Sequence, residues 1–140
     1  MNNVERPARI RQRGFSLIEA LIALVVLSIG LLGIAALQTQ SLLQSRNAFL
    51  TSQATSLAQD MADRIRANPQ GSYNLAEGAD APSGDSLAAN DMRGWLADIA
   101  TTLPESSAEI LISNRRIDIT LEWQEAGEAE PRTLQMVTER

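Results

Sequence analysis

The chain has 140 residues and a formal net charge of −5, which is enough for one small domain and an appendage. It contains no cysteine and no histidine, and all 12 basic residues are arginine, so disulfides, histidine bases and lysine nucleophiles are excluded. Residues 1–14 carry four arginines against one glutamate, whereas residues 15–140 carry eight arginines against 16 acids. An acidic body is a poor binder of phosphate backbones, and we expect no direct nucleic-acid binding.

A basic leader precedes a long apolar segment. From Phe15 to Leu37 the only ionisable side chain is Glu19, and residues 20–37 carry no charge. About 20 apolar helical residues span the hydrocarbon core of a bilayer. This predicts a membrane-spanning helix whose N-terminus is cytoplasmic, because arginines before such a segment favour that orientation. The leader arginines are Arg6, Arg9, Arg11 and Arg13.

Glu19 is an unusual residue for this position. A carboxylate at bilayer depth costs about 2.5–3.5 kcal/mol, and less near the interface. It is either a tolerated interfacial acid or the partner of a positive charge. Cleavage between Gly14 and Phe15 would create an α-amino group four residues before Glu19, and with a pKa of about 7.7–8 that group would be largely protonated. The pair would be weak within one helix and stronger between staggered neighbouring helices.

Two other interpretations of the segment stay open. Gly33-Ile34-Ala35 offers a small-x-small site for secretory cleavage, although the apolar run is longer than in such signals. The segment is alternatively an uncut anchor. Neither interpretation gives Glu19 a purpose.

RGFSLIEALIALVVLSIGLLGIAALQ (13–38) resembles the class III signal of type IV pilins and pseudopilins. That signal is a short basic leader ending in Gly, then Phe, then an apolar helix with Glu four residues on. The resemblance implies that a prepilin peptidase cuts after Gly14 and methylates the amine of Phe15. It also implies that Glu19 aligns an incoming subunit against the Phe15 amine of a neighbour.

Gly30 and Gly33 interrupt the large apolar residues, and glycine inside a helix costs roughly 1 kcal/mol relative to alanine. They indicate either close helix packing or a point where the helix melts in a filament. Many major pilins carry a proline slightly further on, which this chain lacks.

Helical periodicity continues to Asn68-Pro69, where the proline ends the helix. The predicted helix spans 15–67, about 80 Å, with i,i+4 and i,i+3 ion pairs at Asp60–Arg64 and Asp63–Arg66. Because its second half has one apolar face, it needs a globular layer packed on it. That face contains Leu43, Leu50, Ala54, Leu57, Met61 and Ile65.

ATSLAQDMADRIRANP (54–69) resembles the end of this helix in PilV-type minor pilins, and SIGLLGIAALQ (28–38) agrees with the same group. Type II secretion pseudopilins share the N-terminal signal but resemble the second passage less. The resemblance is strong over 14–69 and loose beyond.

Residues 69–91 are rich in Gly, Ser, Asp and Ala and predict a loop. Its acids lack the spacing of an EF-hand, and we expect no metal or other cofactor. A short helix is predicted over about 91–103, with Asn90 as N-cap, Pro104 closing it and Trp95 as a core anchor.

The period then changes to two, which predicts antiparallel strands over about 109–113, 116–123 and 132–137. If Asn114-Arg115 forms a two-residue turn, Ile110 and Ile112 align with Ile119 and Ile117. The resulting fold class is α+β and pilin-like: a long N-terminal helix whose outer half packs on a small sheet, with one additional short helix.

The predicted organisation is a cleaved leader (1–14), a transmembrane and filament-core half-helix (15–37), and a periplasmic globular domain (38–140). The PilV resemblance implies a minor pilin of the pilus tip that supports pilus assembly, adhesion, twitching motility or DNA uptake. Its implied partners are the major pilin, other minor pilins, a tip adhesin and the prepilin peptidase. It would reside in the inner membrane before assembly and in the pilus fibre afterwards.

A minor pseudopilin of type II secretion is the alternative. A membrane-anchored enzyme is disfavoured, because no nucleophile–base set or phosphate loop is present.

Overall fold

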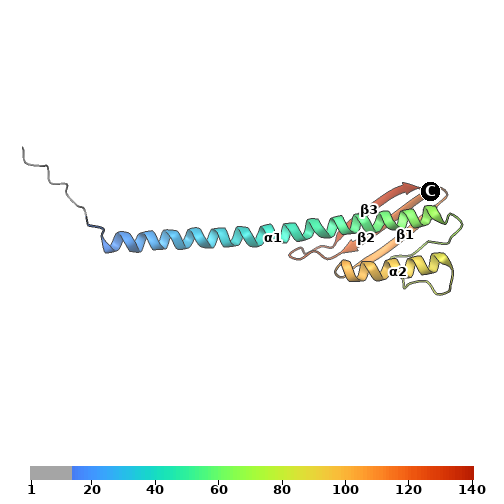
Figure 1. Ribbon diagram of the computed structural model, residues 1–140, viewed down its shortest axis with the longest axis horizontal. Coiled ribbons are helices and arrows are strands. Elements are labelled where there is room, and N and C mark those ends of the chain that lie inside the picture. Colours follow the sequence, from blue (N-terminus) through green and yellow to red (C-terminus); the bar gives the residue numbers. More distant parts are fainter. Residues whose placement is uncertain (1–13) are drawn as a thin grey trace, which may run out of the picture. The chain divides into compact units, whose positions relative to one another are not determined.

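The computed structural model describes residues 14–140, in which two helices precede three strands (Figure 1). The chain divides into two compact units, Met1–Gln40 and Ser41–Arg140. The elements are α1 (Leu17–Ala67), α2 (Leu87–Thr102), β1 (Ser107–Ser113), β2 (Arg116–Trp123) and β3 (Arg132–Glu139).

The described part of the first unit is almost entirely the first half of α1. The helix begins with hydrogen bonds from the amides of Glu19 and Ala20 to the carbonyl of Ser16 (3.0 and 3.2 Å). Apart from Glu19 and a few uncharged polar residues, its side chains are apolar on all sides, and all except half-buried Ala20 are exposed. By length and composition α1 is able to cross a membrane.

The few hydroxyls of this half-helix are satisfied within it. Ser28 Oγ donates to the carbonyl of Leu24 (2.7 Å), and Thr39 Oγ1 donates to that of Ala35 (3.1 Å). Such internal bonds are what apolar surroundings require, because no water is there to accept them.

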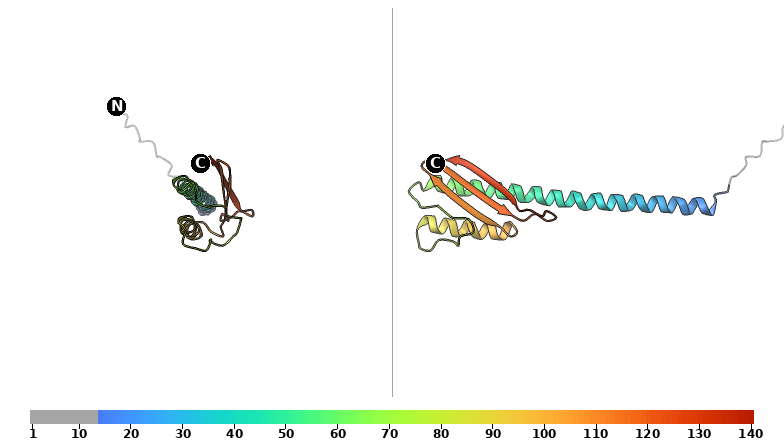
Figure 2. Two further views of the ribbon diagram at one scale, coloured as in Figure 1. Left: turned by 90° about the vertical axis from the view of Figure 1, so that its right-hand side faces the viewer. Right: turned by 180° about the vertical axis from the view of Figure 1, so that it is seen from behind.

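In the second unit, the rest of α1 and α2 lie side by side over one face of the sheet, as the end-on view in Figure 2 shows. The sheet is antiparallel in the order β1-β2-β3. This confirms the predicted α+β class, in which a long helix and a short helix accompany a small antiparallel sheet.

The buried face of α1 follows the helical period, because its residues recur every three or four positions. It consists of Leu50, Ala54, Ala58, Met61, Ala62 and Ile65. Leu43 was expected on this face, but the expectation is wrong: 38% of Leu43 is exposed, because the core cluster starts at Leu50. The helix ends at Ala67, as Asn68-Pro69 predicts.

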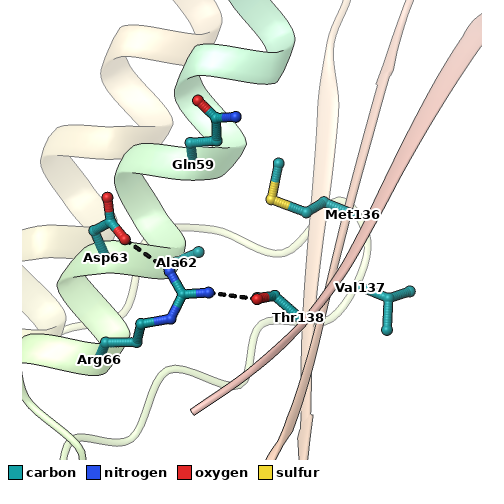
Figure 3. Close-up of a pocket in the computed structure, with 7 residues that line it drawn as sticks. All are labelled: Gln59, Ala62, Asp63, Arg66, Met136, Val137 and Thr138. Atoms are coloured by element: carbon teal, nitrogen blue, oxygen red, sulfur yellow. Dashed lines mark hydrogen bonds and ion pairs between the residues drawn. The ribbon is translucent and has the colours of Figure 1, made fainter.

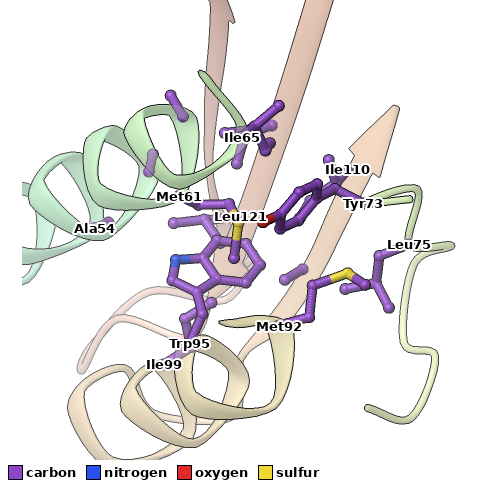
Figure 4. Packing of buried hydrophobic residues seen from close by; sticks show 14 of the residues in the cluster. Ala54, Met61, Ile65, Tyr73, Leu75, Met92, Trp95, Ile99, Ile110 and Leu121 are labelled. Atoms are coloured by element: carbon purple, nitrogen blue, oxygen red, sulfur yellow. The ribbon is translucent and has the colours of Figure 1, made fainter. Parts of the chain in front are cut away.

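Trp95 is fully buried at the centre of the core, between the two helices and the sheet (Figure 4). Its indole Nε1 donates to the carbonyl of Leu57 on α1 (2.8 Å), which gives the buried N–H the partner it needs. The prediction that Trp95 anchors the core is therefore confirmed.

The predicted hairpin register is also confirmed, since Ile110 pairs with Ile119 and Ile112 pairs with Ile117. Asn114 has φ 57°, the left-handed conformation that asparagine tolerates. β1 starts two residues earlier than expected, and β3 ends two residues later.

The expected start of the short helix is wrong. Ser86, not Asn90, is the N-cap of α2, because its hydroxyl accepts a hydrogen bond from the amide of Ala89 (3.1 Å). Asn90 lies inside the helix, and its side-chain amide donates to the carbonyl of Asp85 (3.4 Å). Since Leu87, Ala88 and Ala89 extend the helix readily, the stronger cap lies four residues upstream.

The loop before α2 is more ordered than its composition indicates. Tyr73 and Leu75 are buried, and Leu75 exchanges two 2.9 Å backbone hydrogen bonds with Ile110. Asn74 Oδ1 also accepts from the amide of Ile112 (2.8 Å). The segment therefore covers the outer edge of β1.

Candidate processing and assembly site

The peptide bond between Gly14 and Phe15 lies before the helix, in residues without regular structure. Both residues are exposed, and 73% of Phe15 is accessible. The bond is therefore accessible to another protein and is not held in a helix or strand.

The fold itself does not require glycine at position 14. A Cβ added there would meet no atom within 4 Å. Any requirement for Gly14 would therefore come from a protein that approaches this bond, not from packing within the chain.

Glu19 lies exposed in the first turn of α1. An acid in the first turn is favoured by the partial positive charge of the helix N-terminus, typically by about 0.3–1 kcal/mol. All four salt bridges within residues 14–140 lie in the second unit, so no ion pair there involves Glu19. Its carboxylate has the chemistry to accept hydrogen bonds from an ammonium group of another chain.

Gly30 and Gly33 both lie in unbroken helix. A Cβ at either position would meet nothing within 4 Å, so contacts within the chain do not explain these glycines. The leader residues Arg6, Arg9, Arg11 and Arg13 lie outside the described residues.

The ADRIRANP passage forms a polar network that joins the end of α1 to the loop and α2. Arg64 contacts Asp60 (2.8 Å) and, more loosely, Asp91 of α2 (3.5 Å). Tyr73 donates from its hydroxyl to Asp91 (2.7 Å) and accepts from Asn68 Nδ2 (3.2 Å). These contacts join α1, the loop and α2, so the network has a structural role.

The environment of this network affects two pKa values. Burial of the Tyr73 ring, reinforced by its hydrogen bond to Asp91, raises the pKa of Tyr73. Burial alone would lower the pKa of Arg64, but the hydrogen bond and charge of Asp60, with those of Asp91, raise it. The sequence analysis did not identify Tyr73 as part of a polar network. The only indication was that it is a single aromatic residue in an otherwise polar loop.

No group of three or more acidic side chains that could hold a metal ion occurs among residues 14–140. Asp91, which the sequence placed at the end of the loop, lies in α2 and bonds to Tyr73 and Arg64.

Comparison with known families gives two matches that adjoin in the chain. The family model "Prokaryotic N-terminal methylation motif" matches residues 9–35, and "Type IV pilin Tt1218" matches residues 36–90. We found no significant match among curated proteins or solved structures.

The first match contains the Gly14–Phe15 junction, Glu19 and both helix glycines. The second contains the buried face of α1 and most of the polar network around Tyr73, although Asp91 lies just beyond the match. Type IV pilins are structural proteins that act in pilus assembly, and the methylation motif with its apolar helix fits membrane anchoring before assembly. With the long helix, short helix and three-stranded sheet, these matches place the chain in the type IV pilin family.

Proposed function

We propose that the chain is a minor pilin, which assembles with the major pilin and other minor pilins into a priming complex at the tip of a type IV pilus. The observation that carries the proposal is the first half of α1, apolar on all sides and exposed, directly after Gly14-Phe15 and Glu19. A chain that folds alone would bury such a surface, so its cover must come from lipid or other chains.

The first step is processing by a prepilin peptidase. The leader arginines keep the N-terminus cytoplasmic while the second unit is in the periplasm. The peptidase then cleaves after Gly14 and methylates the new amine of Phe15. The accessible, non-helical junction supports this assignment.

The second step is transfer from the bilayer to the filament. Because lipid is exchanged for equally apolar helices, little free energy distinguishes one axial position of the helix from another. A polar pair supplies that distinction. We propose that Glu19 pairs with the Phe15 amine of a neighbouring subunit and sets the register.

The subtype rests on the passage that resembles PilV-type minor pilins, together with the absence of cysteine. Without a disulfide, the second unit is less suited to be the abundant, mechanically loaded subunit. Adhesion through a tip adhesin, twitching motility or DNA uptake would follow from its place at the pilus tip. Local melting of the helix at Gly30 and Gly33 is a further part of the proposal.

The test is incorporation into pili of Glu19→Val, with Glu19→Gln, which removes the charge alone, and Gln38→Val as a matched control in the same exposed helix. We expect all three variants to be inserted and cleaved. Hydrogen bonds to charged groups contribute about 1.5–3 kcal/mol, so the Glu19 variants should be depleted from sheared pili by roughly tenfold or more. Normal incorporation of Glu19→Val would demote Glu19 to a tolerated interfacial acid.

A further inference from the structure

The two edges of the sheet differ. The outer edge of β1 is bridged by Leu75. The outer edge of β3 has no strand partner among the residues that the structure describes. Edge strands offer a row of backbone donors and acceptors to another chain.

The phase of the β2–β3 ladder shows which groups face outward. The amide of Arg140 donates to the carbonyl of Arg115 (2.7 Å), so these two residues form a hydrogen-bonded pair. In an antiparallel ladder, hydrogen-bonded and non-hydrogen-bonded pairs alternate along the strand. Thr133, Gln135 and Val137 therefore direct their N–H and C=O groups away from β2.

Glu139 belongs to the same outward-facing set. Its carbonyl accepts a hydrogen bond from Arg66 Nε of α1 (3.1 Å), which fixes the same phase independently. Within residues 14–140, the structure gives no hydrogen-bond partner to the outward backbone groups of the three preceding members, Thr133, Gln135 and Val137.

The β3 edge also lacks the usual protection against pairing. Natural edges carry charges, prolines or bulges, but residues 133–138 contain neither a charge nor a proline. The register with β2 is unbroken from Arg132 to Glu139. Between its charged end residues, Arg132 and Glu139, the edge is therefore uncharged, and its register is regular throughout.

A groove of about 390 Å³ runs between this strand and α1. Figure 3 shows Met136 and Thr138 pointing toward the helix, whereas Val137 points away. Ala62 and Met136 give the groove an apolar part, and the Asp63–Arg66 pair (2.7 Å) lines one part of it. An added strand would place alternate side chains over this groove.

The charge of the molecule indicates what would occupy the edge. The outer face of the sheet carries three glutamates besides the Arg116–Asp118 pair, namely Glu109, Glu122 and Glu139. A second copy paired at this edge would bring another negatively charged outer face beside this one, whereas a basic segment would be attracted to that face.

We propose that β3 binds an extended segment of another protein by strand addition. The segment has aliphatic residues at alternate positions, which enter the groove beside Met136, and neutral or basic residues between them. This goes beyond the proposed function, and its test does not depend on leader processing or on Glu19.

The experiment uses the full-length, isotope-labelled protein in detergent micelles and measures amide hydrogen exchange. The probe is the peptide acetyl-KVTVKVT-amide at millimolar concentration. We expect exchange at Thr133, Gln135 and Val137 to slow by about tenfold, because these amides gain acceptors. Exchange at Leu134 and Met136, which already bond to β2, should not change.

A peptide of the same composition, acetyl-VVVKTKT-amide, should not slow exchange because its valines do not alternate. Equal slowing by both peptides, or no slowing by either, would overturn the proposal. Slowing that appears without peptide and grows with protein concentration would assign the edge to a second copy, and would also overturn it.

Gln135→Pro removes an outward N–H without removing a bond to β2. We expect it to keep slow exchange at Met136 but to abolish the effect of the peptide, while Val137→Thr keeps the effect. If Gln135→Pro fails to fold, Gln135→Lys replaces it, and its added positive charge should weaken binding of the lysine-bearing peptide. If the folded variant, Gln135→Pro or Gln135→Lys, binds the peptide as well as the unsubstituted protein does, the proposal is contradicted.

Discussion

The two halves of α1 belong to one continuous helix, but they differ in composition and in what covers them. Leu32 in the first half is 72% exposed, whereas Leu50 in the second is 6% exposed. The first half is apolar on all sides, and the second has one buried face against α2 and the sheet. One unbroken helix therefore passes through two different surroundings.

This difference shows which contacts stabilise each half. The second half is stabilised by the core of its own unit, and its outer faces carry ion pairs such as Asp60–Arg64. The first half makes no contribution to that core. Its apolar surface is matched to lipid and to other helices, the two environments that a pilin meets in turn.

The largest expected effect is at the centre of the core. Trp95→Ala should lower the free energy of unfolding of the second unit by about 3–5 kcal/mol, because it leaves a cavity and removes the bond to the Leu57 carbonyl. Urea unfolding of the full chain in detergent, followed by circular dichroism, measures this. Trp95→Phe is the control and should cost less, and a loss under about 1 kcal/mol in Trp95→Ala would contradict the packing described.

Two substitutions that shorten a side chain, one in each half of α1, test the comparison between the halves directly. Met61→Ala should cost about 2–5 kcal/mol in the same unfolding transition, since Met61 is fully buried. Leu32→Ala should leave that transition unchanged. Equal losses would show that both halves share one cooperative core, and the distinction between them would fail.

A smaller effect is expected at the start of α2. Ser86→Ala should cost about 1 kcal/mol, because the amide of Ala89 loses its acceptor. Asn90→Ala, at the position that the sequence predicted as the cap, should cost less. The opposite order in thermal unfolding would restore Asn90 as the residue that starts the helix.

The smallest effect concerns pH. Because the pKa of Tyr73 is raised in the folded state, its contribution to stability is fully present below the ordinary tyrosine pKa of about 10. That contribution is lost as pH rises toward the folded-state pKa. Tyr73 is the only tyrosine, so the absorbance of tyrosinate measures its titration alone. A midpoint at or below about 10, or the same alkaline loss of stability in Tyr73→Phe, would contradict this account.

Local patterns predicted much of the fold. The hairpin register followed from the alternation of Ile117 and Ile119 with polar residues, because a shift of one residue would expose the whole apolar face. The end of α1 followed from Pro69, which restricts the residue before it. The Gly14–Phe15 junction and Glu19 were recognised as a candidate motif because their spacing is specific, and the methylation-motif match covers them.

Other features depend on tertiary contacts and could not be predicted. Tyr73 is buried by the core cluster, and its hydroxyl bonds to Asp91, a residue 18 positions away. The exposure of Leu43 depends on how far the core extends along α1. The open edge of β3 becomes visible only once the strand order is known.

The central claim is that the exposed half-helix enters a filament after its leader is removed. Mass spectrometry of the N-terminus of the protein isolated from its native membrane or pili tests this most directly. The account predicts a chain that begins with N-methylated Phe15. A chain that retains Arg6 to Arg13, or one that begins after Ala35, would contradict it.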